Sequence, residues 1–429
     1  MIWNKEIECA DKARVKEIQL ENLKAGIKRV EDHPFYKERF AKAGVTSEKI
    51  KSLEDLKYLP FSKKSDLRDN YPFGMLNVPK NKLARVHASS GTTGKPTVVG
   101  YTKADLDMWS ECMARLVCAG GATPDDMVQI AFGYGLFTGA FGLHYAMEKL
   151  GAAVIPTSSG NTEKQIMLMK DFGSTILIST PSYALYISEV MEEMGVKKEE
   201  LSLKYGLFGA EGSTEEMRAQ IERRLGITAT ENYGLSEIIG PGVAGECLEK
   251  CGQHINEDNF IIEIINPETG EVLPEGETGE VVITAPTKEA LPMFRYRTGD
   301  ISRLIPEPCK CGRTTTRMAK LMGRSDDMLI IKGVNVFPSQ VESVLIGMDH
   351  IGPHYQLVVT KNGYTDALEV KVELTDSSVL ESFSELEKLS KSIRHKLHVV
   401  LGIDAKVSLV EPKSIERFTG KAKRVIDLR

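Results

Sequence analysis

The 429-residue sequence contains no apolar run close to the length of about 20 residues that a bilayer-spanning helix needs. It has no excess of positive charge: the formal net charge is −5, which argues against a general nucleic-acid binder. Seven cysteines are too few for a disulfide framework in a chain of this length. Charged residues begin at Lys5, which predicts that no secretion signal is present. We therefore expect a cytoplasmic protein with neither a membrane nor a nucleic acid as partner.

What the sequence does contain is typical of a large globular protein, with 41% hydrophobic and 27% charged residues. Residues 5–45 show helical apolar spacing. From residue 84 to about 240, apolar runs alternate with helical stretches, which predicts an α/β sheet covered by helices. The strand-like runs are MVQIAF (127–132), AAVIP (152–156), STILIST (174–180) and LKYGLFGA (203–210), and the helical stretches are 137–150, 163–171 and 182–195.

The pattern changes twice towards the C-terminus. After residue 255, turn signals such as NPETG and PEGETG separate strand-like runs and predict a β-rich subdomain. The last part combines strand-like segments at 328–332, 356–360 and 367–373 with a charged helix at 380–399. We predict an α/β protein with a large N-terminal domain (1–324) that includes the β-rich subdomain, and a small α+β C-terminal domain (325–429).

A stretch rich in glycine and hydroxyl groups, HASSGTTGKPTVVGYT, occupies residues 87–102. It is not a P-loop, because only two residues separate its glycines and Pro96 keeps Lys95 out of helical geometry. The β-branched residues that follow predict a strand, so the context is strand–loop–strand. Such a loop can bind phosphate through its backbone N–H groups, its hydroxyls and its lysine. The other interpretation is a flexible surface turn.

Five motifs occur in order along the chain: SSGTTGKPT (89–97), NYGLSE (232–237), YRTGD (296–300), GRSDDMLIIKGVNVFPSQVE (323–342) and GKAKR (420–424). Together they resemble the signature motifs of the adenylate-forming enzymes, which include acyl-CoA synthetases, firefly luciferase and peptide-synthetase adenylation domains. The stretches YPFG (71–74), FGAEG (208–212) and GLSEIIGPGVAGEC (234–247) resemble more specifically the phenylacetate–CoA ligases. This resemblance covers essentially the whole chain.

The resemblance implies that ATP converts a carboxylate into an acyl-adenylate and pyrophosphate, and that a thiol then displaces AMP. It implies phosphate binding by Ser90, Gly91, Thr92, Thr93, Gly94 and Lys95, and nucleotide binding by Gly209, Ala210, Glu211, Asn232, Tyr233, Gly234, Asp300, Arg324 and Asp326. In the second group, Tyr233 would lie against the adenine and Asp300 would accept hydrogen bonds from the ribose hydroxyls.

Three further roles follow from the resemblance. Glu237 would ligate Mg²⁺, because magnesium bound with phosphates takes only one or two carboxylates. Lys421 matches the catalytic lysine that bridges the carboxylate and the α-phosphate. Asp326 matches the hinge about which a mobile C-terminal domain turns. Each residue alone also fits an ordinary surface or turn position, but the ordered set does not.

The aromatic and glycine-rich stretch FGYGLFTGAFGLHY (132–145) would shape the acyl pocket, which Gly209 and Ala210 border in the family pattern. Tyr134, Phe137 and Phe141 would enclose an aromatic ring. Packing in a helix core remains the other interpretation of these three side chains.

Four of the seven cysteines lie in GECLEKCGQH (245–254) and CKCGR (309–313). Cys309 and Cys311, with Cys247 and His254, would form the Cys₃His ligand set of a closed structural zinc site. Cys251 competes with Cys247 as a ligand. We expect the site to join the two ends of the β-rich subdomain; the alternative is two reduced cysteine loops without a metal.

We therefore predict an ATP- and Mg²⁺-dependent ligase that transfers an aromatic acid, phenylacetate first, to coenzyme A and releases AMP and pyrophosphate. The resemblance also implies a homodimer. Another aromatic acid, such as indoleacetate, hydroxyphenylacetate or benzoate, also fits, because one methylene in an apolar pocket discriminates by only about 1–3 kcal/mol. The sequence is compatible, too, with transfer of the acyl group to a carrier protein or an amine, and with a nucleotide-binding regulatory protein without turnover.

Overall fold

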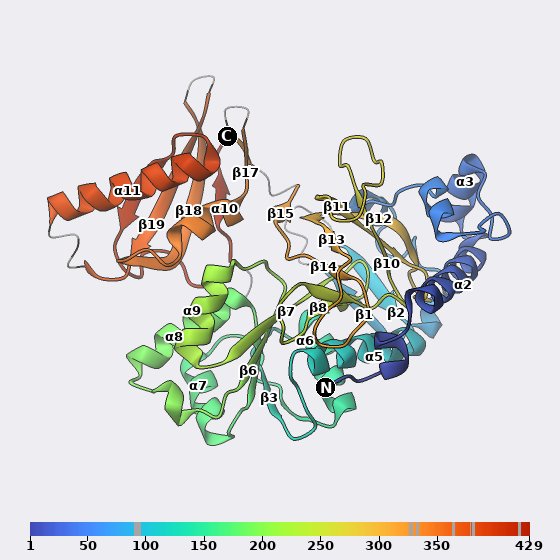
Figure 1. Cartoon of the computed structure of the whole chain (residues 1–429), viewed down its shortest axis with the longest axis horizontal. Helices are drawn as coiled ribbons and strands as arrows, with labels where there is room; N and C mark the ends of the chain where they lie inside the picture. The colour runs from blue at the N-terminus through green and yellow to red at the C-terminus, as the bar shows by residue number, and fades with distance from the viewer. Residues whose placement is uncertain are drawn as a thin grey trace.

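The computed structural model describes residues 1–89, 96–325, 329–331, 334–362, 365–377, 379, 382–418 and 422–429. Figure 1 shows a larger and a smaller lobe, which are joined near β15 (Gly323–Arg324). The smaller lobe, formed by the C-terminal part of the chain, lies beside helices α8 and α9 of the larger lobe.

A nine-stranded mixed sheet runs through the larger lobe in the order β13-β14-β9-β8-β7-β6-β5-β3-β4. Its strands are β3 (Met127–Ile130), β4 (Ala153–Ile155), β5 (Ile176–Ser179), β6 (Tyr205–Phe208), β7 (Thr228–Leu235), β8 (Gly240–Glu246), β9 (Gln253–Ile255), β13 (Leu304–Ile305) and β14 (Arg317–Met318). The neighbouring strands β4, β3, β5, β6 and β7 pair in parallel. The pairs β7–β8, β8–β9, β9–β14 and β14–β13 are antiparallel. The parallel half needs strands buried on both faces, and β5 is buried along its whole length.

Helices pack on this sheet: α5 (Lys103–Ala119), α6 (Gly139–Leu150), α7 (Thr162–Asp171), α8 (Pro181–Glu193) and α9 (Glu215–Leu225). Helix α5 starts at a reciprocal cap, in which the Thr102 hydroxyl accepts the N–H of Asp105 and the Asp105 carboxylate accepts the N–H of Thr102. Further along α5, the Trp109 ring stacks on Tyr101 and its indole N–H donates to the carbonyl of Pro241 at 2.6 Å. These contacts fix α5 against β8.

Two smaller antiparallel sheets complete the larger lobe. Strands β1 (Arg85–Ala88) and β2 (Val98–Tyr101) pair with each other. The second sheet has the order β10-β11-β12-β15, with β10 (Ile261–Ile265), β11 (Gly279–Ala285) and β12 (Met293–Ser302). Because β12 and β15 are in register with Asp300 opposite Arg324, this sheet positions two of the nucleotide-binding residues expected from the sequence.

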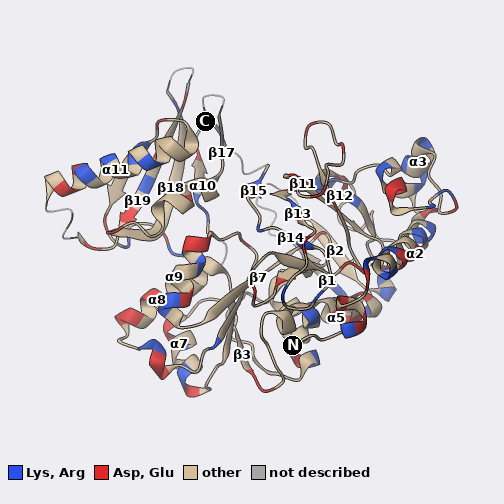
Figure 2. Ribbon diagram, viewed as in Figure 1, with Lys and Arg blue, Asp and Glu red and all other residues tan. Residues whose placement is uncertain are grey.

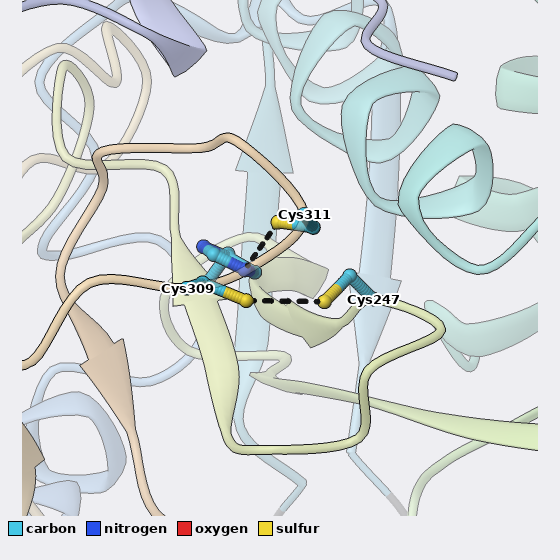
Figure 3. A group of neighbouring side chains, drawn as sticks. Cys247, Cys309 and Cys311 are labelled. Carbon is cyan, nitrogen blue, oxygen red and sulfur yellow. Dashed lines mark hydrogen bonds between the residues drawn. The ribbon is translucent and has the colours of Figure 1, made fainter.

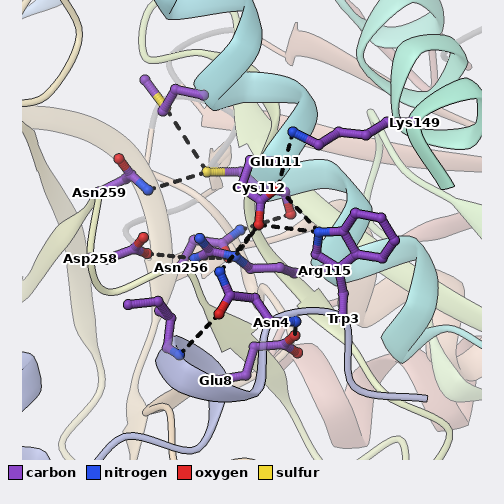
Figure 4. A network of polar contacts seen from close by, with 12 residues as sticks. Trp3, Asn4, Glu8, Glu111, Cys112, Arg115, Lys149, Asn256, Asp258 and Asn259 are labelled. Carbon is purple, nitrogen blue, oxygen red and sulfur yellow. Dashed lines mark hydrogen bonds and ion pairs between the residues drawn. The ribbon is translucent and has the colours of Figure 1, made fainter.

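The N-terminal segment forms α1 (Lys5–Glu8), α2 (Lys12–Val30), α3 (Pro34–Ala43) and α4 (Lys64–Asp69), with 3₁₀ turns at Leu53–Tyr58 and Lys80–Lys82; a further 3₁₀ turn, Lys198–Glu200, lies between α8 and β6. A polar network holds the start of the chain on α5 (Figure 4). The carboxylate of Glu111 accepts hydrogen bonds from Trp3 at 3.1 Å and Asn4 at 3.3 Å, and Arg115 pairs with Asp258 at 2.7 Å. The contacts of Glu111 attach the first residues of the chain to α5.

The smaller lobe contains β16 (Leu329–Ile331), β17 (Val334–Val336), α10 (Pro338–Leu345), β18 (Ile351–Asn362), β19 (Thr365–Leu374), α11 (Phe383–Leu401), β20 (Lys406–Val410) and β21 (Val425–Asp427). Four of its strands form a sheet in the order β20-β19-β18-β21. Its buried apolar side chains, among them Leu357, Val370, Ile393 and Leu397, form a core separate from those of the larger lobe.

The predicted fold class is confirmed: all four strand-like runs between residues 127 and 210 are strands, and the runs after residue 255 form an antiparallel sheet. The position of the cysteine stretches in the fold was not predicted. The stretch before the β-rich region and the stretch near its end do lie together, as expected, but they do so at β8, β9, β13 and β14, one end of the nine-stranded sheet and not the four-stranded one. The reason is that β13 and β14 return to pair beside β9, a long-range pairing with no local sequence signal.

None of the helices in the described parts of the chain is long and apolar enough to cross a membrane. Acidic and basic residues are interspersed along the helices, as the ribbon colours in Figure 2 show for α8, α9 and α11.

We expect Ile27→Ala to destabilise the larger lobe, because Ile27 is fully buried in its main core. Removing a buried isoleucine side chain typically costs about 2–5 kcal/mol. Chemical unfolding measures the effect, and Lys16→Ala, at an exposed position of the same helix, is the control. Equal midpoints for the two variants would contradict the packing of α2.

Candidate functional site

A pocket of about 380 Å³ lies where three separated motifs meet. Its walls include Leu235 and Glu237 from the end of β7 and the loop after it, Thr298 and Gly299 from β12, and Arg324 and Ser325 at β15. These residues come from the NYGLSE, YRTGD and GRSDD motifs, so the structure brings together segments that are far apart in the sequence.

The buried carboxylate of Asp300 is held from two sides beside this pocket. The Tyr233 hydroxyl donates to one oxygen at 2.6 Å, and the Arg324 guanidinium pairs with the other at 2.7 Å. Burial, followed by the Asp300 charge, raises the pKa of Tyr233 well above its usual value, so the phenol stays a donor. The structure therefore places three of the expected nucleotide residues in one contact group and turns the Tyr233 hydroxyl to Asp300.

Glu237 is 6% exposed and lines the pocket, with the Lys64 ammonium 3.2 Å from its carboxylate. Lys64 was not predicted from the sequence. It begins α4, far from Glu237 in the chain, and its stretch carries no motif that would have shown the contact.

Glu280 and Arg297 are two further pocket residues that were not predicted from the sequence. Their side chains form an ion pair across β11 and β12, and Glu280 also accepts the backbone N–H of Gly299 at 3.2 Å. Gly299 has φ +77°, in the left-handed region that favours glycine. Glu280 thus fixes the backbone of β12 just before Asp300. The sequence of either strand alone does not reveal these contacts of Glu280, because it does not show which residue lies opposite on the neighbouring strand.

The FGAEG loop follows β6 and lies against the start of the NYG motif. A Cβ at Gly209 would lie 3.0 Å from the Asn232 side chain, and Asn232 donates to the carbonyl of Phe208 at 2.9 Å. Ala210 is exposed with φ +69°. The Glu211 carboxylate is bound to the backbone N–H groups of Ser182 and Ala422.

Gly234 lies where β7 and β8 approach most closely. A Cβ at this position would lie 1.8 Å from the carbonyl oxygen of Gly240, so no other residue fits without moving the backbone. This approach sets the direction in which the chain leaves β7 towards Glu237.

The three expected acyl-pocket aromatics are not all together. Tyr134 and Phe141 contact each other edge to face with ring centroids 5.2 Å apart, and the Tyr134 hydroxyl bonds His144 at 3.0 Å. Phe137 is 48% exposed. Arg85, which was not predicted from the sequence, lies over the Phe141 ring at 5.0 Å.

The phosphate-loop residues Ser90, Gly91, Thr92, Thr93, Gly94 and Lys95, the hinge residue Asp326 and the catalytic-lysine position Lys421 lie outside the described residues. The segments on both sides of the loop are strands, with Ala88 opposite Val98, and Ser89 exchanges two hydrogen bonds with Thr97. The predicted strand–loop–strand context is therefore correct for the residues that flank the loop.

The predicted metal ligands converge (Figure 3). The ligand atoms of Cys247, His254, Cys309 and Cys311 all lie within 4.8 Å of one another. The Sγ atoms of Cys247 and Cys309 are 3.7 Å apart, and Cys311 Sγ is 3.4 Å from His254 Nε2. Cys251 is exposed and lies outside this group, although its Sγ is 3.5 Å from that of Cys309.

The imidazole of His254 is prepared to act as a neutral ligand. Burial, together with Arg313 and Arg317, lowers its pKa to about 3, so the ring carries no charge at neutral pH. Its Nδ1 bonds the Thr315 hydroxyl at 2.9 Å, which leaves Nε2 turned to the thiols. Burial raises the pKa of the Cys247 thiol, an effect that a divalent cation between the thiols would oppose.

Comparison with known proteins agrees with this geometry. The family model described as AMP-binding enzyme matches residues 15–288, and that described as AMP-binding enzyme C-terminal domain matches residues 333–429. A phenylacetate-coenzyme A ligase from Aromatoleum evansii is 52% identical over 99% of this chain and 96% of its own length. The chain belongs to the phenylacetate-coenzyme A ligase family. Members from Escherichia coli and Thermus thermophilus are 49% and 48% identical, over 99% and 100% of their lengths and the whole of this chain.

Solved structures add a comparison of domain arrangement within this superfamily. A 2-hydroxyisobutyryl-CoA ligase in the postadenylation state, in complex with 2-HIB-AMP, matches the whole chain and 92% of its own with a TM-score of 0.94 at 29% identity. The same enzyme in the thioesterification state matches 99% of this chain and 92% of its own, with a TM-score of 0.74. The lobes of this chain are thus arranged as in the first of these structures.

We expect Tyr233→Phe to lower the free energy of unfolding by about 1.5–3 kcal/mol, because the buried Asp300 carboxylate loses a charge-assisted hydrogen bond. Tyr58→Phe, at a residue that is 58% exposed, is the matched control. Chemical denaturation of both variants measures the difference. If the two variants unfold alike, the phenol does not stabilise Asp300.

Proposed function

We propose that the protein uses ATP to convert phenylacetate into its acyl-adenylate and then transfers the phenylacetyl group to coenzyme A, with release of AMP and pyrophosphate. The observation that carries this proposal is the pocket in which the NYGLSE, YRTGD and GRSDD motifs meet. It is supported by four phenylacetate-coenzyme A ligases that are 46–52% identical to the chain over at least 99% of its length.

The chemistry explains why these residue types are needed. A carboxylate is a poor electrophile, and both the acid and ATP are anions, so the protein must hold two negative groups in contact and offset the charge that develops on the α-phosphate. We assign the β- and γ-phosphates to the loop of residues 90–95 and the ribose hydroxyls to Asp300. We assign the adenine to Gly209, Ala210 and the strand that carries Tyr233.

Lys421 is assigned the catalytic function in the first step. Its ammonium group would bridge the acid carboxylate and the α-phosphate, where it offsets both charges. Asp326 is assigned the hinge, and we place the boundary between the domains at residues 324 and 325. The separate apolar core of the smaller lobe supports this division. A homodimer in solution is part of the proposal on the family resemblance alone.

Glu237 is the residue that would hold Mg²⁺, which when bound supplies neutralisation of phosphate charge. The donor set fits: Glu237 is a buried carboxylate that lines the pocket, and its partner there is the half-exposed ammonium of Lys64, whereas the second acid, Glu280, is paired with Arg297 and also accepts the N–H of Gly299. We assign the acyl pocket to Tyr134 and Phe141, with Phe137 at its exposed side.

We also propose a structural zinc ion held by Cys247, His254, Cys309 and Cys311. Two thiolates at about 2.3 Å from a tetrahedral zinc lie about 3.8 Å apart, and the Cys247 and Cys309 sulfurs are 3.7 Å apart. A Cys₃His set of four protein ligands has no open position, so the metal would fix the loops and not take part in the reaction. The Cys247 sulfur lies within 4.8 Å of the other three ligand atoms, and Cys251 is not in this group, which favours Cys247 over Cys251 as the ligand.

The function is tested by pyrophosphate release with ATP and Mg²⁺ on phenylacetate, hydroxyphenylacetate, indoleacetate, benzoate and a medium-chain fatty acid, with and without coenzyme A. We expect phenylacetate to give the highest kcat/KM and sustained turnover to require coenzyme A. Lys421→Ala should reduce pyrophosphate release by about 100-fold or more, since it removes charge stabilisation at the α-phosphate, and should leave ATP binding intact. Preferred turnover of the fatty acid would overturn the assigned substrate class.

For zinc, we expect about one ion per chain in the purified protein, measured by plasma mass spectrometry. Cys247→Ser should lose the metal, because it removes one of the four converging ligands. Cys251→Ser, which changes the neighbouring exposed thiol, should keep it and is the matched control. The reverse pattern would make Cys251 the ligand, and a metal-free wild-type protein would remove zinc from the proposal.

A further inference from the structure

The contact between the two lobes includes one carboxylate that binds backbone groups from both. Glu211, in the loop after β6, accepts the N–H of Ser182 at 2.7 Å through one oxygen. Its other oxygen accepts the N–H of Ala422, in the smaller lobe, at 3.0 Å. Ala422 directly follows Lys421 in the sequence.

The larger-lobe side of this contact is rigid. Ser182 lies in the first turn of α8, a helix of 13 residues that starts with Thr180 as N-cap and Pro181. Its N–H belongs to the first turn and has no partner within the helix, and a negative charge at this end is favoured by the helix dipole. Glu211 therefore has a fixed anchor on the larger lobe, and its second oxygen determines where the backbone at Ala422 lies.

Other contacts between the lobes surround Glu211 but do not touch Ala422. Glu342 of α10 accepts the N–H of Thr214 at 3.4 Å, and Arg424 of the smaller lobe donates to the Ser182 hydroxyl at 3.5 Å. Farther out on α8, Glu189 pairs with His354 at 2.7 Å and with Arg417 at 3.4 Å. These contacts hold the smaller lobe as a body, whereas Glu211 binds the segment next to the catalytic-lysine position.

The whole chain, with this contact between its lobes, matches the two postadenylation structures of the 2-hydroxyisobutyryl-CoA ligase with TM-scores of 0.93 and 0.94. The score against the thioesterification-state structure is 0.74. The bridge from Ser182 through Glu211 to Ala422 is therefore present in the lobe arrangement that resembles the postadenylation state.

We propose that Glu211 is a positioning residue for the adenylation step, because it fixes the backbone beside Lys421 against the N-terminus of α8. This inference rests on the proposed function, in which Lys421 acts in adenylation only. It replaces the nucleotide contact that the sequence resemblance implied for Glu211 with a contact that acts through the lysine. The thioester step, in which Lys421 has no assigned part, does not need the bridge.

The experiment measures the two half-reactions separately. Adenylation is followed as single-turnover pyrophosphate release from phenylacetate and ATP, and thioester formation starts from purified phenylacetyl-adenylate and coenzyme A. Glu211→Gln keeps one carbonyl oxygen as acceptor, and Glu211→Ala keeps none. Since misplacement of a reacting group by about 1 Å can cost about 100-fold, we expect adenylation to fall by about 10-fold in the first variant and about 100-fold in the second.

Thioester formation should stay within about twofold of wild type in both variants, which also shows that they fold. The affinity for ATP, measured by calorimetry, should not change. Glu216→Gln, at an exposed carboxylate in the first turn of α9, is the surface control. Glu189→Gln is the second control, since it weakens contacts between the lobes without touching Ala422.

Three results would overturn the proposal: an equal fall in both half-reactions, a weaker affinity for ATP that accounts for the whole loss, or an equal adenylation loss in Glu189→Gln. The second result would return Glu211 to direct nucleotide binding, and the third would make it one of several general docking contacts. Failure of the proposed function is distinguishable, because the wild-type protein would then show no phenylacetate-dependent pyrophosphate release.

Discussion

The candidate site depends on the need to satisfy one buried carboxylate. Asp300 is only 2% exposed, and an ionised carboxylate away from water is costly unless it is paired and hydrogen-bonded. Tyr233 from the nine-stranded sheet and Arg324 from β15 supply these partners. The requirement therefore joins the large mixed sheet to the four-stranded sheet, to which both Asp300 and Arg324 belong, and the pocket lies where these two sheets meet.

The features that could be predicted from the sequence are those that depend on local patterns. Strands β3, β5 and β6 are short apolar runs, and the motif residues Tyr233, Glu237 and Asp300 carry local signatures, so both could be identified without a structure. The Cys₃His group was also found, because Cys309-x-Cys311 is a local pattern, although its place in the fold was not.

The residues that were missed depend on long-range register. Lys64 reaches Glu237 from the N-terminal segment, and Glu280 meets Arg297 only because β11 and β12 pair as they do. Glu211 was identified, but its partners were not, since Ser182 and Ala422 are backbone donors and any residue type other than proline supplies an N–H. Contacts of this kind leave no trace in the identity of the partner residue, so only the folded structure reveals them.

The chemical type of the contacts between the lobes determines how readily the smaller lobe can change its position. Apart from Ile346, which packs into a larger-lobe core, the contacts described above are hydrogen bonds and ion pairs, such as those of Glu189 with His354 and of Glu342 with the N–H of Thr214. The side chains of His354 and Glu189 are only 13% and 19% exposed, so the attraction within the pair is offset by the cost of removing both groups from water. An apolar interface of the same extent would hold the smaller lobe permanently. The hydrogen bonds of a polar interface can be replaced by hydrogen bonds to water when the lobes separate. While they are formed, they fix the orientation of the smaller lobe, because hydrogen bonds require a defined geometry. A few weak but directional bonds therefore suit a domain that must be accurately placed for the first reaction and released before the second.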